Sequence, residues 1–147
     1  MKKITIIFVL LIILCSVVWS DLGNELIQAA KDDNLSEAER LLNAGANVNF
    51  QDNDGKTALM EAAWYGYTEL VELLINAGAN IIIQTDQGWT ALMSAAYVGY
   101  PDITELLINA GANVNLDYAG GWTVLSVAIN KDHIEIVELL RNAGAVE

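Results

Sequence analysis

The only histidine of the chain, His133, is the first residue to consider for chemistry. As a general base or a metal ligand, its imidazole would need other groups to converge on the same point. The sequence places no second histidine and no cysteine near it. Motifs that bind phosphates or zinc, or that activate a serine, are also absent. We therefore expect no catalytic residue, no cofactor and no metal, and we interpret His133 as structural.

One segment, "DNDGKTALME" at residues 52–61, has part of the pattern of a calcium loop. Asp52, Asp54 and Glu61 fall at the third, fifth and twelfth positions of such a loop. Its first position would be Phe50, whose side chain has no oxygen to coordinate a cation. The segment is therefore not expected to bind calcium.

Aromatic and charged side chains at recurring positions are better candidates for a functional role. Tryptophan and tyrosine are the residue types that most often anchor a protein partner. The aromatic candidates are Trp64, Tyr65, Trp89, Tyr97 and Trp122. The charged residues that accompany them are Asp54, Lys56, Asp86 and Lys131. Their role depends on the elements that position them.

Those elements follow from an internal repeat. The phrase "LLINAGAN" stands at residues 73–80 and again at 106–113. Its glycine belongs to an evenly spaced series: Gly45, Gly78, Gly111 and Gly144. A fixed period of this size predicts a solenoid, in which each unit buries its apolar face against its neighbours.

Residues 55–80 show how one unit should fold. Thr57 is expected to cap a first helix, which ends at Gly66, where a left-handed residue costs little. A second, antiparallel helix carries the apolar series that follows and ends at Gly78. The next segment should run extended and turn at residues 86–88.

Two short helices and a turn in a unit of about 33 residues resemble the ankyrin repeat. The stretches "GKTALMEAA", "GWTALMSAA" and "GWTVLSVAI" are similar to the G-x-T-P-L-H-x-A signature of that family. The resemblance covers about residues 24–146 and implies an all-α solenoid with β-hairpin or turn fingers. It implies a domain over residues 21–147 in four units, at about 21–51, 52–84, 85–117 and 118–147.

The signature also departs from the family. Met60, Met93 and Ser126 stand where the family has the histidine that ties adjacent repeats together. We therefore expect more apolar packing and less polar tethering between units. The last unit keeps apolar residues up to the end, so its outer face should be incompletely capped and could allow self-association.

The resemblance implies a place for the candidate residues. In ankyrin-like folds the turn tips and the exposed end of the first helix form a concave face. The five aromatic residues should then form one exposed strip, with Trp89 at an open tip, rimmed by the acidic and basic candidates. Such a strip suits a protein partner with apolar anchors and basic residues. Alternatively, each ring only packs on the neighbouring unit.

The amino terminus predicts export. Residues 1–20 combine a basic start, an apolar run over 4–19 and a small residue, Ser20, before Asp21. This is the pattern of a bacterial secretory signal peptide, and it predicts a periplasmic or secreted protein. If residues 4–19 are not cleaved, they would anchor the chain in a membrane. Cys15 is either a lipid-attachment site or an apolar filler, and Leu14 before it favours the filler.

The net charge limits the class of partner. The chain carries a formal net charge of −12, and removal of residues 1–20 takes away Lys2 and Lys3, which gives −14. An acidic body of this kind repels phosphate backbones, so no nucleic acid is expected. We expect a non-enzymatic protein-binding module without a small-molecule substrate. The alternative is a structural component of the cell envelope that assembles through its repeat ends.

Overall fold

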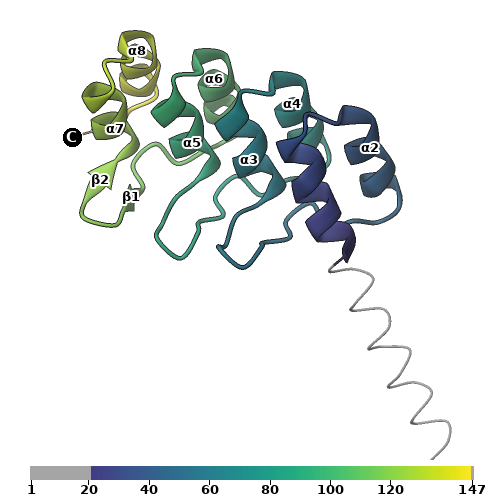
Figure 1. Ribbon diagram of the computed structural model, residues 1–147. Coiled ribbons are helices and arrows are strands. Elements are labelled where there is room, and N and C mark those ends of the chain that lie inside the picture. The colour runs from purple at the N-terminus through teal and green to yellow at the C-terminus, as the bar shows by residue number, and fades with distance from the viewer. Residues whose placement is uncertain (1–20, 147) are drawn as a thin grey trace, which may run out of the picture.

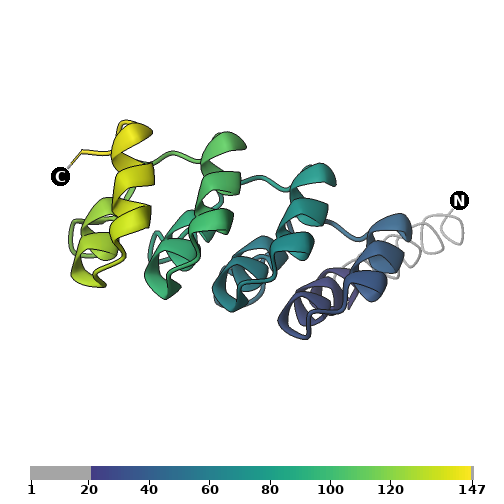
Figure 2. The same ribbon diagram turned by 90° about the horizontal axis from the view of Figure 1, so that it is seen from above.

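The computed structural model describes residues 21–146, which form a row of helix pairs (Figures 1 and 2). The expected signal peptide lies outside the described residues. The first pair joins a helix over residues 21–31 to α2 (Leu35–Asn43). The following pairs are α3 (Ala58–Tyr65) with α4 (Thr68–Asn76), α5 (Ala91–Val98) with α6 (Pro101–Asn109), and α7 (Val124–Asn130) with α8 (Ile134–Asn142). Within residues 21–146, no helix is long and apolar enough to cross a membrane.

Each pair is connected to the next by a finger that projects from one end of the helices (Figure 1). In the last finger, β1 (Asp117–Tyr118) pairs antiparallel with β2 (Trp122–Thr123). The finger at residues 52–56 is closed by a backbone hydrogen bond of 2.9 Å, from the Asp52 amide to the Lys56 carbonyl. The finger at residues 85–89 is closed by an equivalent bond. Among the described residues, strand pairing is therefore confined to the last finger, and the others are turns.

The helix ends follow the local chemistry of the sequence. The Thr57 hydroxyl caps α3 by accepting a hydrogen bond from the Met60 amide, as predicted. Thr90 and Thr123 cap α5 and α7 in the same way. Gly66 ends α3 in the left-handed region, with a φ of 84°, which is also as predicted.

The core runs through the whole row, and the first helices of the inner pairs lie at its centre. In α3 the successive residues 58–63 are all buried, and the same is true of residues 91–96 in α5. Ala62 and Ala95 have no exposed surface. Alanine at these places lets α3 and α5 pack closely, and α7 packs on the other side of α5.

A ring at the start of a second helix covers the end of the previous first helix. The Tyr100 ring lies over Gly66, where a Cβ atom would be 2.5 Å from Tyr100 Cζ. The Tyr100 hydroxyl lies within hydrogen-bond distance of the Tyr65 carbonyl, at 3.4 Å. His133 repeats this arrangement, with Nε2 3.2 Å from the Tyr97 carbonyl oxygen. The structural interpretation of His133 fits this position between α7 and α8.

This packing gives the first testable prediction, which compares Gly66→Ala with Gly78→Ala. Both glycines are left-handed, with φ of +84° and +86°, but a Cβ at Gly78 would meet no atom within 4 Å. Gly78→Ala should therefore cost only the conformational penalty, about 1 kcal/mol of unfolding free energy. Gly66→Ala should cost about 1 kcal/mol more, because the Tyr100 ring must move. Urea denaturation would measure both, and equal losses would show that the ring does not tighten this junction.

The units are also held together by polar side chains in the fingers. Gln51 Nε2 donates to the Gln84 carbonyl of the next finger, at 3.2 Å. Asn115 Nδ2 donates to the Gly144 carbonyl at 3.1 Å. Polar tethers between units are therefore present, although they come from amide side chains and not from the positions of the family histidine. The expected packing is present as well, since Met60 is buried beneath its neighbours.

The carboxyl-terminal pair leaves apolar surface open. Ala63 and Ala96, each the sixth residue of its helix, have no exposed surface. At the sixth position of α7 stands Ile129, which is 41% exposed. Ile134 and Val146 are also exposed. This end of the row therefore presents apolar side chains to solvent, and one of them, Ile129, stands where the inner pairs bury an alanine.

Candidate functional site

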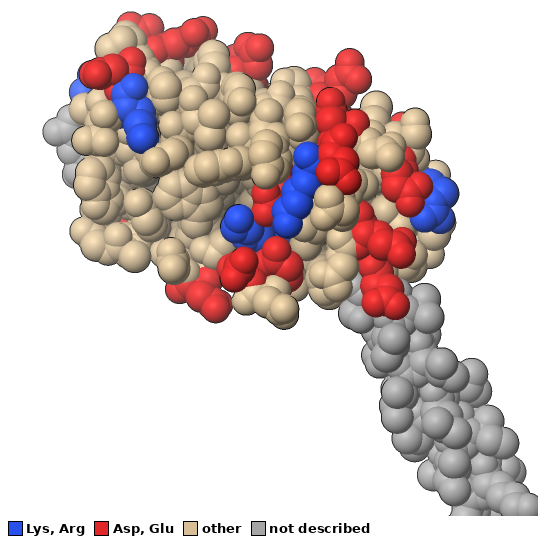
Figure 3. All heavy atoms as spheres, viewed as in Figure 1, with Lys and Arg blue, Asp and Glu red and all other residues tan. Residues whose placement is uncertain are grey.

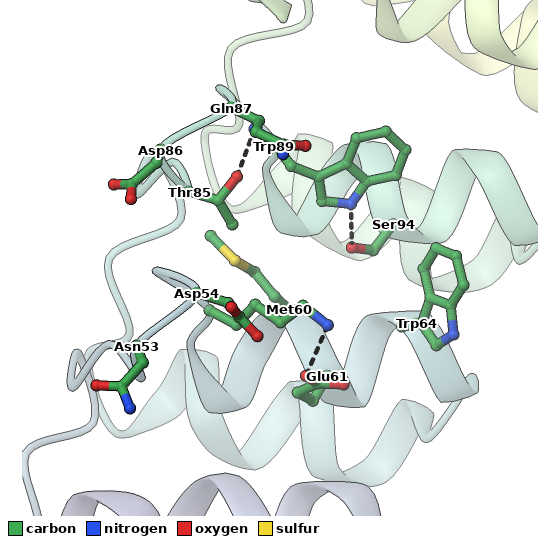
Figure 4. A pocket seen from close by; sticks show the side chains of 11 residues that line it. Asn53, Asp54, Met60, Glu61, Trp64, Thr85, Asp86, Gln87, Trp89 and Ser94 are labelled. Atoms are coloured by element: carbon green, nitrogen blue, oxygen red, sulfur yellow. Dashed lines mark hydrogen bonds and ion pairs between the residues drawn. The ribbon is translucent and has the colours of Figure 1, made fainter. Parts of the chain in front are cut away.

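A hollow lies between two neighbouring fingers and the helices above them. It has a volume of about 430 Å³ and is bounded by the fingers at 52–56 and 85–89 and by α3 and α5 (Figure 4). Its wall contains two indoles and four charged residues: Trp64, Trp89, Asp54, Lys56, Glu61 and Asp86. The hollow thus brings together candidate residues that are far apart in the sequence.

Four aromatic rings form a contiguous cluster beside the hollow, and we call them the aromatic cluster: Trp64, Trp89, Tyr97 and Tyr118. Trp64 stacks on Tyr97, with ring centroids 5.5 Å apart and an interplanar angle of 17°. Trp89 meets Tyr97 edge to face at 5.7 Å and Tyr118 at 4.9 Å. Stacked and edge-to-face pairs are the favourable arrangements of aromatic rings. Tyr118, in β1, was missed in the sequence as a candidate.

Trp89 does not lie at an open tip, as its sequence position suggested. It is half-buried and packs against the core. Its indole Nε1 donates a hydrogen bond of 2.8 Å to the Ser94 hydroxyl on α5 (Figure 4). Trp89 therefore packs between the core and the other rings of the cluster. Trp64 and Tyr97 are the members with exposed surface, at 39% and 36%.

The other two aromatic candidates lie apart from the cluster. Tyr65 stacks on Tyr67, with centroids 5.8 Å apart, and is 45% exposed. Trp122 is 41% exposed and lines a second hollow with Ile129 near the carboxyl-terminal end. Ring contacts therefore do not join all five aromatic candidates. Three of them meet, and two stand at separate places.

In the segment that resembles a calcium loop, the first acid, Asp52, has a structural role. Asp52 Oδ1 accepts hydrogen bonds from the Asp54 and Lys56 amides, at 3.0 and 2.9 Å, which closes the finger. Across residues 21–146, no group of three or more His, Cys, Asp and Glu side chains could hold a metal ion.

The arrangement of helix pairs and fingers agrees with a comparison of the sequence with known families. A family model for ankyrin repeats in three copies matches residues 8–85, 26–118 and 82–146. These matches cover most of the chain. The chain belongs to the ankyrin repeat family. A search of curated proteins found no match.

Ankyrin repeats are generally protein–protein interaction modules, and the family is typically non-enzymatic. The charges of this ankyrin repeat chain are unevenly distributed. Figure 3 shows acidic residues over the amino-terminal pair and along the upper and lower edges, around a broad uncharged area over α5 and α7. Asp54 and Asp86 are exposed in the fingers. The Lys131 ammonium lies 4.0 Å from the centroid of the Tyr97 ring, a cation–π contact at the edge of the aromatic cluster.

One acid of this ankyrin repeat chain is buried at the hollow. Glu61 on α3 is only 4% exposed, and its Oε1 accepts no hydrogen bond from the described residues. Two ammonium groups balance its charge, those of Lys56 at 3.3 Å and Lys31 at 3.8 Å. A buried carboxylate needs such compensation. This buried acid was not among the predicted site residues, and the available signal was an acid within the otherwise apolar run of residues 58–64 in α3.

Proposed function

We propose that this chain is a non-enzymatic module that binds a protein partner through the aromatic cluster and the acidic finger tips. The observation that carries the proposal is the pair of exposed rings, Trp64 and Tyr97, next to a hollow of about 430 Å³. Large aromatic side chains beside a pocket are typical of residues that dominate a binding energy. The acids Asp54 and Asp86 would favour a basic partner and disfavour nucleic acid.

We also propose that the domain comprises four units, each of about 33 residues, with the boundaries given above. The first helices of the inner and last pairs begin at Ala58, Ala91 and Val124, which are evenly spaced along the chain. The helix over residues 21–31 and α2 complete the row as its first pair.

The binding proposal predicts a large effect of Trp64→Ala. A partner would first be captured with the full chain, identified and purified, and its affinity measured by calorimetric titration. Trp64→Ala should weaken binding by about 2 kcal/mol, roughly thirtyfold in Kd, because an exposed ring anchor is lost. Thermal melts in parallel would separate this from a loss of stability.

The matched control is Glu72→Ala. Glu72 is exposed on α4, the second helix of the same pair, and does not line the hollow. It should leave the affinity nearly unchanged. A stronger effect of Glu72→Ala than of Trp64→Ala would place the recognition surface on the other side of the row and contradict the proposal.

Export through residues 1–20 remains part of the proposal and is tested separately. Amino-terminal sequencing of the protein recovered outside the cytoplasm should begin at Asp21 or within a few residues of it. A chain of full length that is recovered only from membranes would instead indicate that residues 4–19 remain as an anchor.

A second candidate function is assembly through the carboxyl-terminal end. It is favoured by the apolar surface of Ile129, Ile134 and Val146, which are 41%, 67% and 64% exposed. Burial of such surface between copies would drive self-association. Sedimentation over a range of concentrations distinguishes the two functions, because an assembly component would form larger species as concentration rises and a binding module would stay monomeric.

A further inference from the structure

We propose that the hollow between the fingers at 52–56 and 85–89 receives an arginine side chain of the partner. Its guanidinium would lie at the Glu61 carboxylate, and its methylene stem along the indoles of Trp64 and Trp89. This inference rests on the proposed binding function and specifies the chemistry recognised at one part of that surface.

The charge of the hollow selects a cation. Glu61 lines the hollow, but its Oε1 is buried and accepts no hydrogen bond from the described residues, so a ligand can reach this oxygen only when the Lys56 ammonium moves away. Asp54 and Asp86 add two more carboxylates to the wall, against one lining lysine, Lys56. A cation that donates to Glu61 Oε1 would satisfy an acceptor that the free chain leaves incomplete.

The shape of the hollow favours arginine over lysine. Trp64 and Trp89 stand with ring centroids 6.5 Å apart and planes tilted by 58°, which leaves indole surface on the side of the hollow (Figure 4). A guanidinium is planar, stacks on aromatic faces and carries five donors, whereas an ammonium is a compact, strongly hydrated charge. Arginine can therefore contact an indole and more than one carboxylate at once.

In the chain without a partner, Lys56 would occupy the position that the guanidinium takes in the complex. Its ammonium lies 3.3 Å from Glu61 Oε1, but its side chain is 48% exposed and sits at the edge of the hollow. The half-exposed ammonium of Lys56 can turn to solvent, and the buried Glu61 carboxylate stays compensated only if another cation takes its place. The arriving guanidinium would displace Lys56, while Lys31 of the first pair would keep its contact of 3.8 Å with Glu61 Oε1.

The test uses acetyl-arginine methylamide as the probe on the full chain, and follows the indole N–H signals of Trp64 and Trp89 by NMR. We expect saturable binding with a Kd in the range of about 1–10 mM, as a single side chain allows. The neutral analogue, acetyl-citrulline methylamide, has the same shape without the charge. It should bind at least about tenfold more weakly. Equal binding of the two probes would overturn the proposal.

Three variants complete the test. Glu61→Gln should weaken the arginine probe by at least about tenfold, since it removes the buried charge. Lys56→Ala should strengthen it about threefold or more, because it removes the competing cation. Arg40→Ala is the matched control, because Arg40 pairs with Glu37 on α2 and does not line the hollow, so removal of this cation should change nothing. Unchanged affinity in both Glu61→Gln and Lys56→Ala would overturn the proposal.

Two further measurements keep the outcome clear. If Glu61→Gln lowers the melting temperature enough to prevent titration, Asp54→Asn replaces it, and an unchanged affinity there would count against the proposal. With the natural partner, we expect both Trp64→Ala and Glu61→Gln to weaken binding. A loss with Trp64→Ala alone would reject the arginine site and leave the proposed function standing. If neither variant weakens the partner, both proposals fail.

Discussion

Replacement of Trp89 by alanine is expected to lower the free energy of unfolding by about 3 kcal/mol. The half-buried indole contacts Trp64, Tyr97 and Tyr118 and donates a hydrogen bond of 2.8 Å to the Ser94 hydroxyl. Its removal would leave a gap between the finger and α5, and would remove the ring that joins the other members of the cluster. Urea denaturation followed by circular dichroism would measure the loss.

The control for this prediction is Trp122→Ala. Trp122 also follows a finger turn, but it is 41% exposed and lies apart from the aromatic cluster. Its removal should cost less than about 1 kcal/mol, as expected for a surface position. Trp89→Phe should fall between the two, because it keeps most of the ring contacts and loses the hydrogen bond. Equal losses for the two alanine variants would show that the cluster does not stabilise the fold.

Ala95→Leu is expected to have a comparable effect, with a loss of roughly 3 kcal/mol. Ala95 has no exposed surface and lies in α5, which packs against both α3 and α7. The added atoms would have to separate helices on two sides. Thermal and urea denaturation of the full chain would measure the change.

The comparison that tests this prediction is Ala29→Leu. Ala29 is also buried, at 4% exposure, but it lies in the helix over residues 21–31, at the amino-terminal end of the described row. A helix at the end of a stack has a neighbouring pair on one side and can move outward. Its loss should be clearly smaller, and equal losses at the two positions would contradict a picture of nearest-neighbour stacking.

The elements of the fold could be predicted because their signals are local. Thr57 caps α3 and Gly66 ends it through contacts within a few residues, which a sequence reveals directly. Because the sequence repeats, the same prediction of helix starts and helix ends applies to each of the following pairs. Burial of Ala62 follows in turn, because a small residue at a repeated helical position indicates a close neighbour.

The candidate site was only partly predictable because it arises between pairs. Tyr118 contacts Trp89 from the next finger, and no aromatic residue stands at the matching places in the earlier fingers to mark it. Glu61 is balanced by Lys31 from the first pair and by Lys56 from its own finger. Such contacts depend on how side chains of different pairs turn toward one another, which the period alone does not specify.

The exposure of Trp89 was misjudged for a related reason. Its place after a turn suggested an open tip, but the indole folds back over α5 toward Ser94. A large apolar ring gains more from this contact than from water. The acidic candidates Asp54 and Asp86 have no such alternative and remain exposed.

The isoleucine at the sixth position of α7 has a consequence for how such a protein could change in length. Ala63 and Ala96 are small enough for the following pair to cover them completely, whereas the branched side chain of Ile129 would hold an incoming helix away. If a gene duplication appended one more copy at this end, the new helix pair would therefore pack poorly against α7 unless Ile129 were also replaced by alanine. Insertion of a copy between the existing inner pairs would meet no such obstacle, so the row can lengthen from within more readily than from its end.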